Sequence, residues 1–124
     1  MFEILGIIVL GQEPASKISD KTLEWLLHRE FGSRAGEVKQ KLRRINSDSP
    51  NGRNRFSAAI LKLANRDFEK IDCYINLCND DFRDVVAAAE YPVRMRFAFN
   101  KIAGWKKRQI YFYDWNQYST WLRK

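Results

Sequence analysis

The chain has 124 residues, of which 45% are hydrophobic and 14% aromatic, and this length is enough for one domain with a buried core. Only three prolines and six glycines accompany them, which argues against a disordered chain, and two cysteines are too few for a disulfide scaffold. We therefore expect a single cytoplasmic domain over residues 1–124, with Cys73 and Cys78 as buried, reduced thiols.

The formal net charge of +7 is unevenly distributed along the sequence. Residues 34–66 carry nine basic and two acidic side chains (+7), residues 67–90 carry two and seven (−5), and residues 91–124 carry eight and one (+7). Either the acidic segment packs between the two basic segments, or the basic segments converge on one face that binds a polyanion. The first arrangement needs no ligand, and we favour it.

The first eleven residues, MFEILGIIVLG, are the only stretch that suggests a membrane. Their apolar run is about half of the ~20 residues that a transmembrane helix needs, and Glu3 interrupts it. We expect residues 1–11 to form a short strand or a buried helix, and the chain to have no membrane span. The remaining alternative is the end of an anchor that begins upstream.

Two amphipathic helices are predicted next. The segment 19–31 begins with Ser19 and Asp20, both good N-cap residues, carries apolar side chains at helical spacing, and stops at Gly32. The segment 33–46 continues with apolar positions at three- and four-residue steps, and its polar face is almost wholly basic. Each helix therefore has one face that can be buried.

A break and further helices follow. Residues 47–54, SDSPNGRN, combine turn-forming residues and should separate two helices. Apolar residues that recur every three or four positions predict helices within residues 55–65, 66–79 and 81–92. Asn79 or Asp80 is the expected N-cap of the last of these. Pro92 ends it, because the residue before a proline is pushed out of the helical region.

The last third of the sequence fits two structures. Residues 93–99, VRMRFAF, alternate like a half-buried strand, and residues 108–113, RQIYFY, could pair with them in a hairpin. Residues 111–122 also keep a helical spacing, and we expect a terminal helix over 114–124, capped by Asp114. The predicted fold is mainly α, a compact bundle of about five to six short helices. A small C-terminal β-hairpin or an N-terminal strand is left open as an addition.

Three stretches are the most distinctive: GRNRFSAAILKLA at residues 52–64, RDVVAAAEYP at 83–92 and DWNQYSTWL at 114–122. Together with the sequence around them, over residues 36–122, they resemble a group of small uncharacterised bacterial proteins. The resemblance implies a mostly helical fold and a bacterial cytoplasmic setting, and it implies no catalytic residue.

Neither the acidic residues nor the histidine form a recognisable catalytic pattern. Asp80 and Asp84 share a helix face, but carboxylates in a first helical turn gain about 0.3–1 kcal/mol from the helix dipole without any ligand. His28, the single histidine, lies within a helix, and the sequence has no serine elbow and no glycine-rich phosphate loop. We expect no enzymatic activity, no cofactor and no metal, and a partly buried His28.

Basic residues in two places suggest nucleic-acid binding as the alternative function. Residues 39–55 hold six cations close together: Lys39, Lys41, Arg43, Arg44, Arg53 and Arg55. Residues 106–108 repeat the theme beside aromatic side chains that could stack on bases. No helix-turn-helix, RNP or zinc-finger pattern accompanies them, so nucleic-acid binding is our second hypothesis.

Aromatic residues crowd the C-terminal segment in larger number than one helix stripe can bury. They either pack into the core or serve as interface anchors, a role for which proteins favour Trp, Tyr and Arg. Our first hypothesis is a non-enzymatic domain that binds another protein, in a regulatory or toxin-neutralising role. The expected contact residues are Trp105, Lys106, Lys107, Arg108, Trp115, Tyr118 and Trp121.

Overall fold

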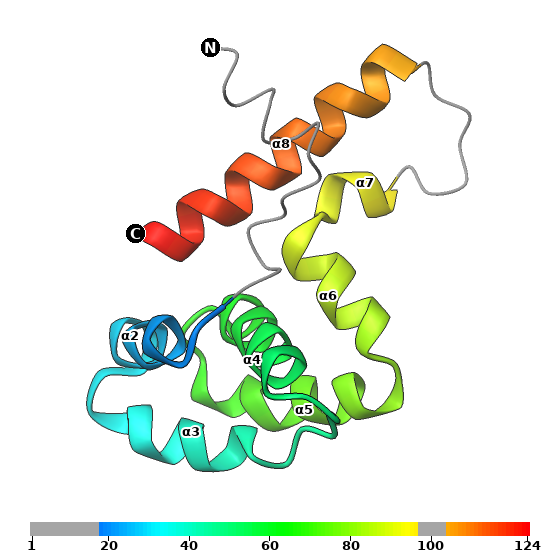
Figure 1. Cartoon of the computed structure of the whole chain (residues 1–124). Helices are drawn as coiled ribbons and strands as arrows, with labels where there is room; N and C mark the ends of the chain where they lie inside the picture. The colour runs from blue at the N-terminus through cyan, green and yellow to red at the C-terminus, as the bar shows by residue number, and fades with distance from the viewer. Residues whose placement is uncertain (1–17, 97–103) are drawn as a thin grey trace.

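The computed structural model describes residues 18–96 and 104–124, most of which are helical (Figure 1). The helices are α2 (Asp20–Phe31), α3 (Ala35–Leu42), α4 (Pro50–Ala64), α5 (Ile71–Asp80), α6 (Phe82–Glu90), α7 (Pro92–Arg96) and α8 (Gly104–Arg123), with 3₁₀ turns at Gly32–Arg34 and Phe68–Lys70. Within these two described ranges there is no strand, and the prediction of a mainly helical bundle is confirmed. The strand, helix or anchor predicted for residues 1–11 lies outside the described residues.

Helix α2 begins and ends where the sequence predicts. The Ser19 side chain accepts a hydrogen bond from the Thr22 N–H at 3.1 Å, which satisfies one of the free donors of the first turn. Gly32 ends the helix with a φ of 50°, a left-handed conformation that a residue without a Cβ adopts at little cost. The chain therefore turns sharply after Phe31, and α3 packs against α2.

Helix α4 begins earlier than predicted. The Ser49 Oγ accepts a hydrogen bond from the Gly52 N–H at 3.0 Å, and Pro50 is the first helical residue. Proline is well suited to this position because its missing N–H would have no partner there. The break predicted over residues 47–54 is therefore too long, and its second half is helical. At the other end Asn65 stops α4 in the left-handed region, as expected.

The boundary between α5 and α6 falls one or two residues later than predicted. Asp81, rather than Asn79 or Asp80, is the N-cap of α6, and its side chain accepts a hydrogen bond from the Arg83 N–H at 3.0 Å. Asn79 instead joins α5 to the end of α3. Its Oδ1 accepts from the Asn46 N–H at 2.8 Å, and its Nδ2 donates to the Arg44 carbonyl at 3.0 Å.

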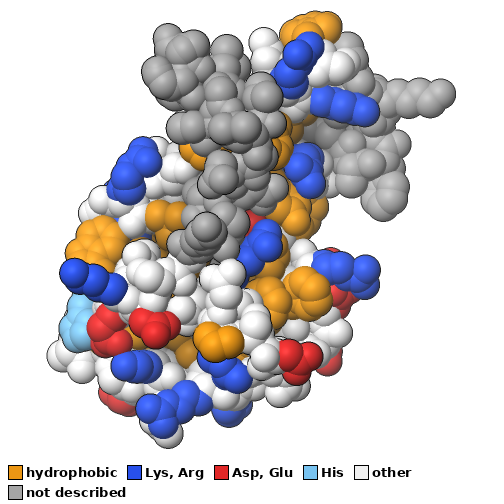
Figure 2. Space-filling view, in the orientation of Figure 1, with side chains coloured by type: hydrophobic (Ala, Val, Ile, Leu, Met, Phe, Trp, Pro, Cys, Tyr) orange, Lys and Arg blue, Asp and Glu red, His pale blue; other side chains and the backbone are white. Residues whose placement is uncertain are grey.

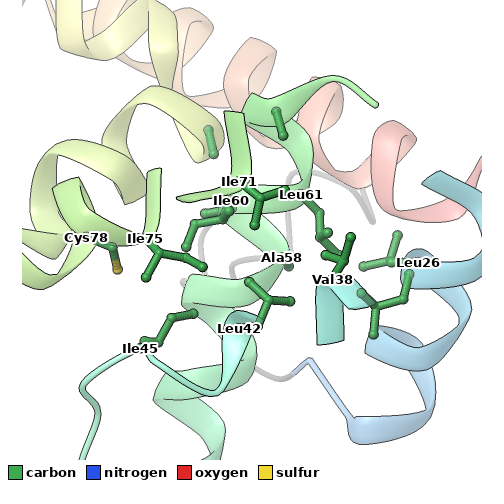
Figure 3. Packing of buried hydrophobic residues seen from close by; sticks show 14 of the residues in the cluster. Leu26, Val38, Leu42, Ile45, Ala58, Ile60, Leu61, Ile71, Ile75 and Cys78 are labelled. Carbon is green, nitrogen blue, oxygen red and sulfur yellow. The ribbon is translucent and has the colours of Figure 1, made fainter. Parts of the chain in front are cut away.

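The core lies where α2, α3, α4 and α5 meet, and aliphatic side chains from all four helices point into it (Figure 3). Leu26, Val38, Leu61 and Ile75 are each fully buried. On α4 the buried residues include several alanines, whose small side chains allow α5 and α6 to pack closely against it. Helix α6 continues the bundle towards α7 and α8 (Figure 1).

Three side chains are more exposed than predicted. Phe82, expected in the core, is 47% exposed and stacks on Phe56 with 4.9 Å between ring centroids. Cys73 is exposed and only Cys78 is buried, because the inward face of α5 passes through Cys78 and two isoleucines; both thiols are free. Burial raises the pKa of the Cys78 thiol to about 11. His28 is also exposed, with its Nδ1 3.0 Å from the Glu24 carbonyl oxygen.

The predicted C-terminal hairpin is wrong for the described residues. Residues 92–96 form helix α7, and residues 108–113 belong to helix α8, which is confirmed as a terminal helix but begins at Gly104. Asp114 is therefore in the middle of α8 and does not cap it. Residues 97–99 of the predicted strand lie outside the described residues.

Candidate functional site

Helix α8 buries one face and leaves its beginning uncovered. Ile110, Asp114, Tyr118 and Trp121 follow one another at steps of four, four and three, so they share one face of the helix. Tyr118 on this face is fully buried. The face packs on α6 and α7, and its polar Asp114 is as inaccessible as the aromatic residues around it, with 2% exposed.

Asp114 and Gln117 satisfy the backbone groups freed where α6 ends and α7 begins. Pro92 interrupts the helical path there, and each new helix end leaves backbone donors or acceptors without intrahelical partners. The Asp114 carboxylate accepts from the Val93 N–H at 3.1 Å and from the Arg94 N–H at 2.9 Å. Gln117 Nε2 donates to the carbonyls of the last two residues of α6, at 3.3 and 3.2 Å. These contacts fix α8 on the α6–α7 corner.

A second buried contact joins α4 to the end of α6, beside α8. Arg55 donates to both carboxylate oxygens of Glu90, at 2.8 and 2.7 Å, and the Glu90 side chain is 4% exposed. The hydroxyl of Tyr118 is buried without a hydrogen-bond partner among the described residues, and burial raises the pKa of Tyr118 well above its ordinary value. A cavity of about 20 Å³ opens next to these residues, which is room for one water molecule and no more.

The other end of α8 is held by Arg29 of α2. The Arg29 guanidinium lies 4.9 Å from the Trp25 ring centroid and 4.9 Å from that of Trp121, and its Nη1 donates to the Trp121 carbonyl at 2.7 Å. That carbonyl lies in the last turn of α8, where the helix dipole favours a cation. The Arg29 Nε also donates to the buried Glu30 carboxylate at 2.9 Å. Trp121 is therefore part of the fold's own packing.

The first turns of α8 are more exposed than the rest of the helix. All residues from Gly104 to Gln109 are exposed, and Figure 1 shows this end of α8 farther from α2–α5 than the rest of the helix. Trp105 is 60% exposed and Tyr113, two turns later, is 57% exposed. We call the exposed side chains at this end the α7–α8 surface: Arg94, Met95, Arg96, Trp105, Lys106, Lys107, Arg108 and Tyr113.

The α7–α8 surface contains four of the seven predicted contact residues, namely Trp105 and residues 106–108. Trp115 is partly buried, while Tyr118 and Trp121 point into the domain and stack on each other with 5.7 Å between centroids. We therefore leave Tyr118 and Trp121 out of the contact surface. The sequence reasoning missed the contribution of α7, because the alternation of residues 93–96 resembles a strand; Pro92, a frequent first residue of helices, was the available signal.

Most of the six cations predicted for nucleic-acid binding have partners within the domain. Lys39 pairs with Glu24, Lys41 and Arg44 pair with Asp72, and Arg55 pairs with Glu90. Arg53 donates to the carbonyls of Arg43 and Ile45, at 3.2 and 2.8 Å. Arg43 is exposed and forms no ion pair with the residues described. The basic residues of α3 and those at the beginning of α8 lie at opposite ends of the molecule (Figure 1).

A groove of about 320 Å³ runs between α2, α3 and α4. Leucine side chains form part of its wall, and its rim carries Lys39, Arg43 and Arg53 together with Asp20 and Glu24. Because two carboxylates accompany the three cations, this groove does not present the uniform positive potential that attracts a polyanion.

Several acidic residues of 67–90 act in the fold. Asp81 caps α6, and Asp72 pairs with Lys41 and Arg44 of the α3 region. In the described ranges, no three or more His, Cys, Asp or Glu side chains are grouped so that they could hold a metal ion. Nor does any helix there have the length and apolar character needed to cross a bilayer.

Comparison with known proteins adds no functional assignment. No family model matches the chain, and no curated protein or solved structure matches it either.

Proposed function

We propose that this chain is a protein-binding domain and that the α7–α8 surface is its contact site. One observation carries the proposal: Trp105 is 60% exposed on a stretch of helix whose residues are exposed on every side. A tryptophan is the side chain most often found as an interface anchor, because one residue can bury 150–250 Å² on binding. The remainder of α8 is fixed by Asp114, Gln117 and Arg29, so the exposed end is presented on a rigid element.

The setting that we propose is the bacterial cytoplasm. The proposal is supported by the resemblance of residues 36–122 to small bacterial proteins and by the two free thiols, Cys73 and Cys78. A regulatory or toxin-neutralising role fits a domain of this kind, which acts by occupying a surface of its partner. We propose such binding, without catalysis, as the activity of the chain.

Site-specific photocrosslinking in living cells tests the contact site. A benzophenone amino acid is placed at Trp105 or at Tyr113, and, as a matched control, at Leu77 of α5, which is 47% exposed away from the proposed surface. We expect light-dependent adducts with another protein at positions 105 and 113, and none at position 77. Identical adducts from all three positions, or none from positions 105 and 113, would exclude the α7–α8 surface as the contact site.

The same experiment separates the second hypothesis from the first. Adducts at positions 105 and 113 that return to the mass of the free chain on nuclease treatment would support nucleic-acid binding through residues 106–108. Adducts that nuclease leaves unchanged, and that yield peptides of a second protein on digestion, support a protein partner.

A further inference from the structure

The α7–α8 surface has cations but no accessible carboxylate side chain. Residues 91–124 contain a single acidic residue, Asp114, which is 2% exposed and already binds the backbone N–H groups of α7. The five cations of the surface, Arg94, Arg96 and residues 106–108, are all exposed, and none forms an ion pair with a described residue. Figure 2 shows Lys and Arg side chains, without Asp or Glu, around the upper end of the molecule where α8 begins.

The clustering of these cations contrasts with the ion pairs that hold α3 and α4. There, cations are neutralised locally, as in the pairs of Lys39 with Glu24 and of Arg55 with Glu90. At the beginning of α8 the like charges repel one another, and an anionic partner that binds there would relieve that repulsion.

The surface also has an apolar component that a simple polyanion would leave uncovered. Trp105 and Tyr113 are eight residues apart on α8, which places them about 12 Å apart along the helix axis and about 80° apart around it. Met95 of α7, the helix that packs on α8, is a further exposed apolar side chain, with 43% exposed. A partner that covers this surface therefore needs apolar side chains as well as carboxylates.

The shape of the surface favours a protein over a nucleic acid. Proteins that bind single strands use a basic groove that follows the backbone and aromatic platforms for the bases. The cavity described next to α7 and α8 measures about 20 Å³, too small for a base, and every residue from Gly104 to Gln109 is exposed. An exposed helix end that carries a tryptophan instead fits into a groove of another protein.

From these observations we infer that the partner contributes an acidic surface with exposed apolar side chains, a groove or segment rich in Asp and Glu together with Leu or Phe, which receives the beginning of α8. The inference rests on the proposed function and specifies the chemistry of the partner. Charge complementarity speeds association and excludes other partners, while Trp105 supplies the apolar anchor.

Fluorescence anisotropy with the full chain tests the inference. The probes are a labelled peptide of about 20 residues made of Glu, Asp, Leu and Phe, its neutral counterpart with Gln and Asn, and a single-stranded oligothymidine of similar length. We expect the acidic peptide to bind at least about tenfold more tightly than the neutral peptide at low salt, and this difference to shrink as salt is added.

Two charge-reversal variants locate the binding. The variant with Lys106→Glu, Lys107→Glu and Arg108→Glu should bind the acidic peptide at least about tenfold more weakly. The matched control with Lys21→Glu, Arg43→Glu and Lys70→Glu reverses three exposed cations elsewhere, so both variants change the net charge from +7 to +1. The control should bind within about twofold of the wild type, because it leaves the α7–α8 surface intact.

The Trp105→Ala variant tests the apolar part of the inference. It should bind the acidic peptide at least about fivefold more weakly while its salt dependence stays that of the wild type. Circular dichroism and thermal unfolding of each variant establish that it is folded.

Several results would overturn the inference. With the wild type, these are equal binding of the acidic and neutral peptides, no binding of the acidic peptide at low salt, or tighter binding of the oligothymidine than of the acidic peptide. With the variants, they are an equal loss of affinity in both charge-reversal variants, or an unchanged affinity of Trp105→Ala for the acidic peptide. None of these removes the proposed function, which depends on the photocrosslinks at positions 105 and 113 and fails if those are absent.

Discussion

At the scale of single residues, chemically similar side chains have different roles, and burial separates them. Trp105 is 60% exposed, whereas Trp121 packs on Arg29 and Tyr118. Arg108 is exposed without an ion pair in the described structure, whereas Arg29 is almost enclosed, with 13% of its side chain exposed. Arg29 therefore contributes to stability, and the exposed residues are free to contribute to binding.

Replacing Arg29 should destabilise the domain more than replacing an exposed arginine. The Arg29→Ala variant loses the hydrogen bond to the Trp121 carbonyl and the contacts with two indole rings, and it leaves buried Glu30 with only Arg66 at 3.5 Å. We expect the free energy of unfolding to fall by about 2–3 kcal/mol in urea titrations.

The matched comparison is Arg34→Ala, which removes an ion pair with Glu37 that is about half exposed and a contact with the Phe68 ring. That variant should lose about 1 kcal/mol or less. An equal effect of the two substitutions would show that Arg29 does not hold α8 in place. The Arg29→Lys variant keeps the charge but lacks the planar guanidinium. Its loss in the free energy of unfolding should lie between those of Arg29→Ala and Arg34→Ala.

At the scale of helices, the ends are set by short-range hydrogen bonds, and most of them follow from the sequence. Ser19 and Gly32 bound α2 as their residue types predict. The beginning of α4 was missed because Pro50 and Gly52 are common in turns. Ser49 and Pro50 together form a helix start, in which the serine caps and the proline occupies the first turn.

Two glycines in helices should respond oppositely to alanine. Gly36 of α3 has nothing within 4 Å of the position of an added Cβ, so Gly36→Ala should raise the free energy of unfolding by about 0.5–1 kcal/mol. At Gly52 an added Cβ would lie 2.8 Å from the Ser47 Oγ and 2.9 Å from the Ser49 Oγ, which caps the helix. Gly52→Ala should therefore give no stabilisation, since displacing the cap costs about 1 kcal/mol.

Thermal unfolding of the two variants measures this difference. An equal gain from both alanines would mean that the cap on α4 tolerates the added methyl group. A loss of stability in both variants would mean that the φ of Gly36 or its surroundings disfavour alanine, despite the open space around this residue.

Helices α7 and α8 show what the sequence pattern missed at this scale. Asp114 lies on the buried face of α8. Because a buried face is recognised in the sequence by its apolar residues, a carboxylate at this position is assigned to a helix end instead. Asp114 does cap a helix, but that helix is α7. Its carboxylate accepts hydrogen bonds from the N–H groups of Arg94 and Val93, which lie 20 and 21 residues earlier in the sequence. A cap between segments so distant in sequence has no local signature.

At the scale of the whole molecule, the acidic segment 67–90 forms ion pairs with the first basic segment, residues 34–66. Asp72 pairs with Lys41 and Arg44, and Glu90 pairs with Arg55, so carboxylates of residues 67–90 neutralise cations of residues 34–66. The second basic segment, at the beginning of α8, receives no such partner from the described residues. We favoured an arrangement in which the acidic segment packs between the two basic segments. It is found for residues 34–66 but, among the described residues, not for the beginning of α8.

The pairing of Asp72 should make stability depend on pH. The hydrogen bond from Lys41 is the main reason that the pKa of Asp72 lies below 3.8, with smaller contributions from the charges of Lys41 and Arg44. Because the folded state holds this carboxyl deprotonated more strongly than the unfolded state does, its contribution is complete above about pH 5. It is lost as the pH falls below 3.8 through the folded pKa.

Urea titrations of wild type and Asp72→Asn at several pH values test this. The wild type should be more stable by up to about 1 kcal/mol near pH 6, and the difference should vanish near pH 2 and shrink in high salt. Asp48→Asn, in the exposed loop before α4, should show no comparable difference. A difference for Asp72→Asn that persists at pH 2 would exclude the ionised pair as its cause.

The helical class of this protein, the approximate positions of most helices and most residues of the central core follow from the amino-acid sequence. These depend on periodicity and on caps whose partners lie within four residues. Tertiary packing sets three further features: Asp114 caps α7, Arg29 holds the end of α8, and several cations of α3 and α4 are neutralised. These contacts join residues 15 to 92 positions apart, and their partners are selected by packing. The exposed end of α8 is decided in the same way, since a helix face is uncovered only where no other part of the fold reaches it.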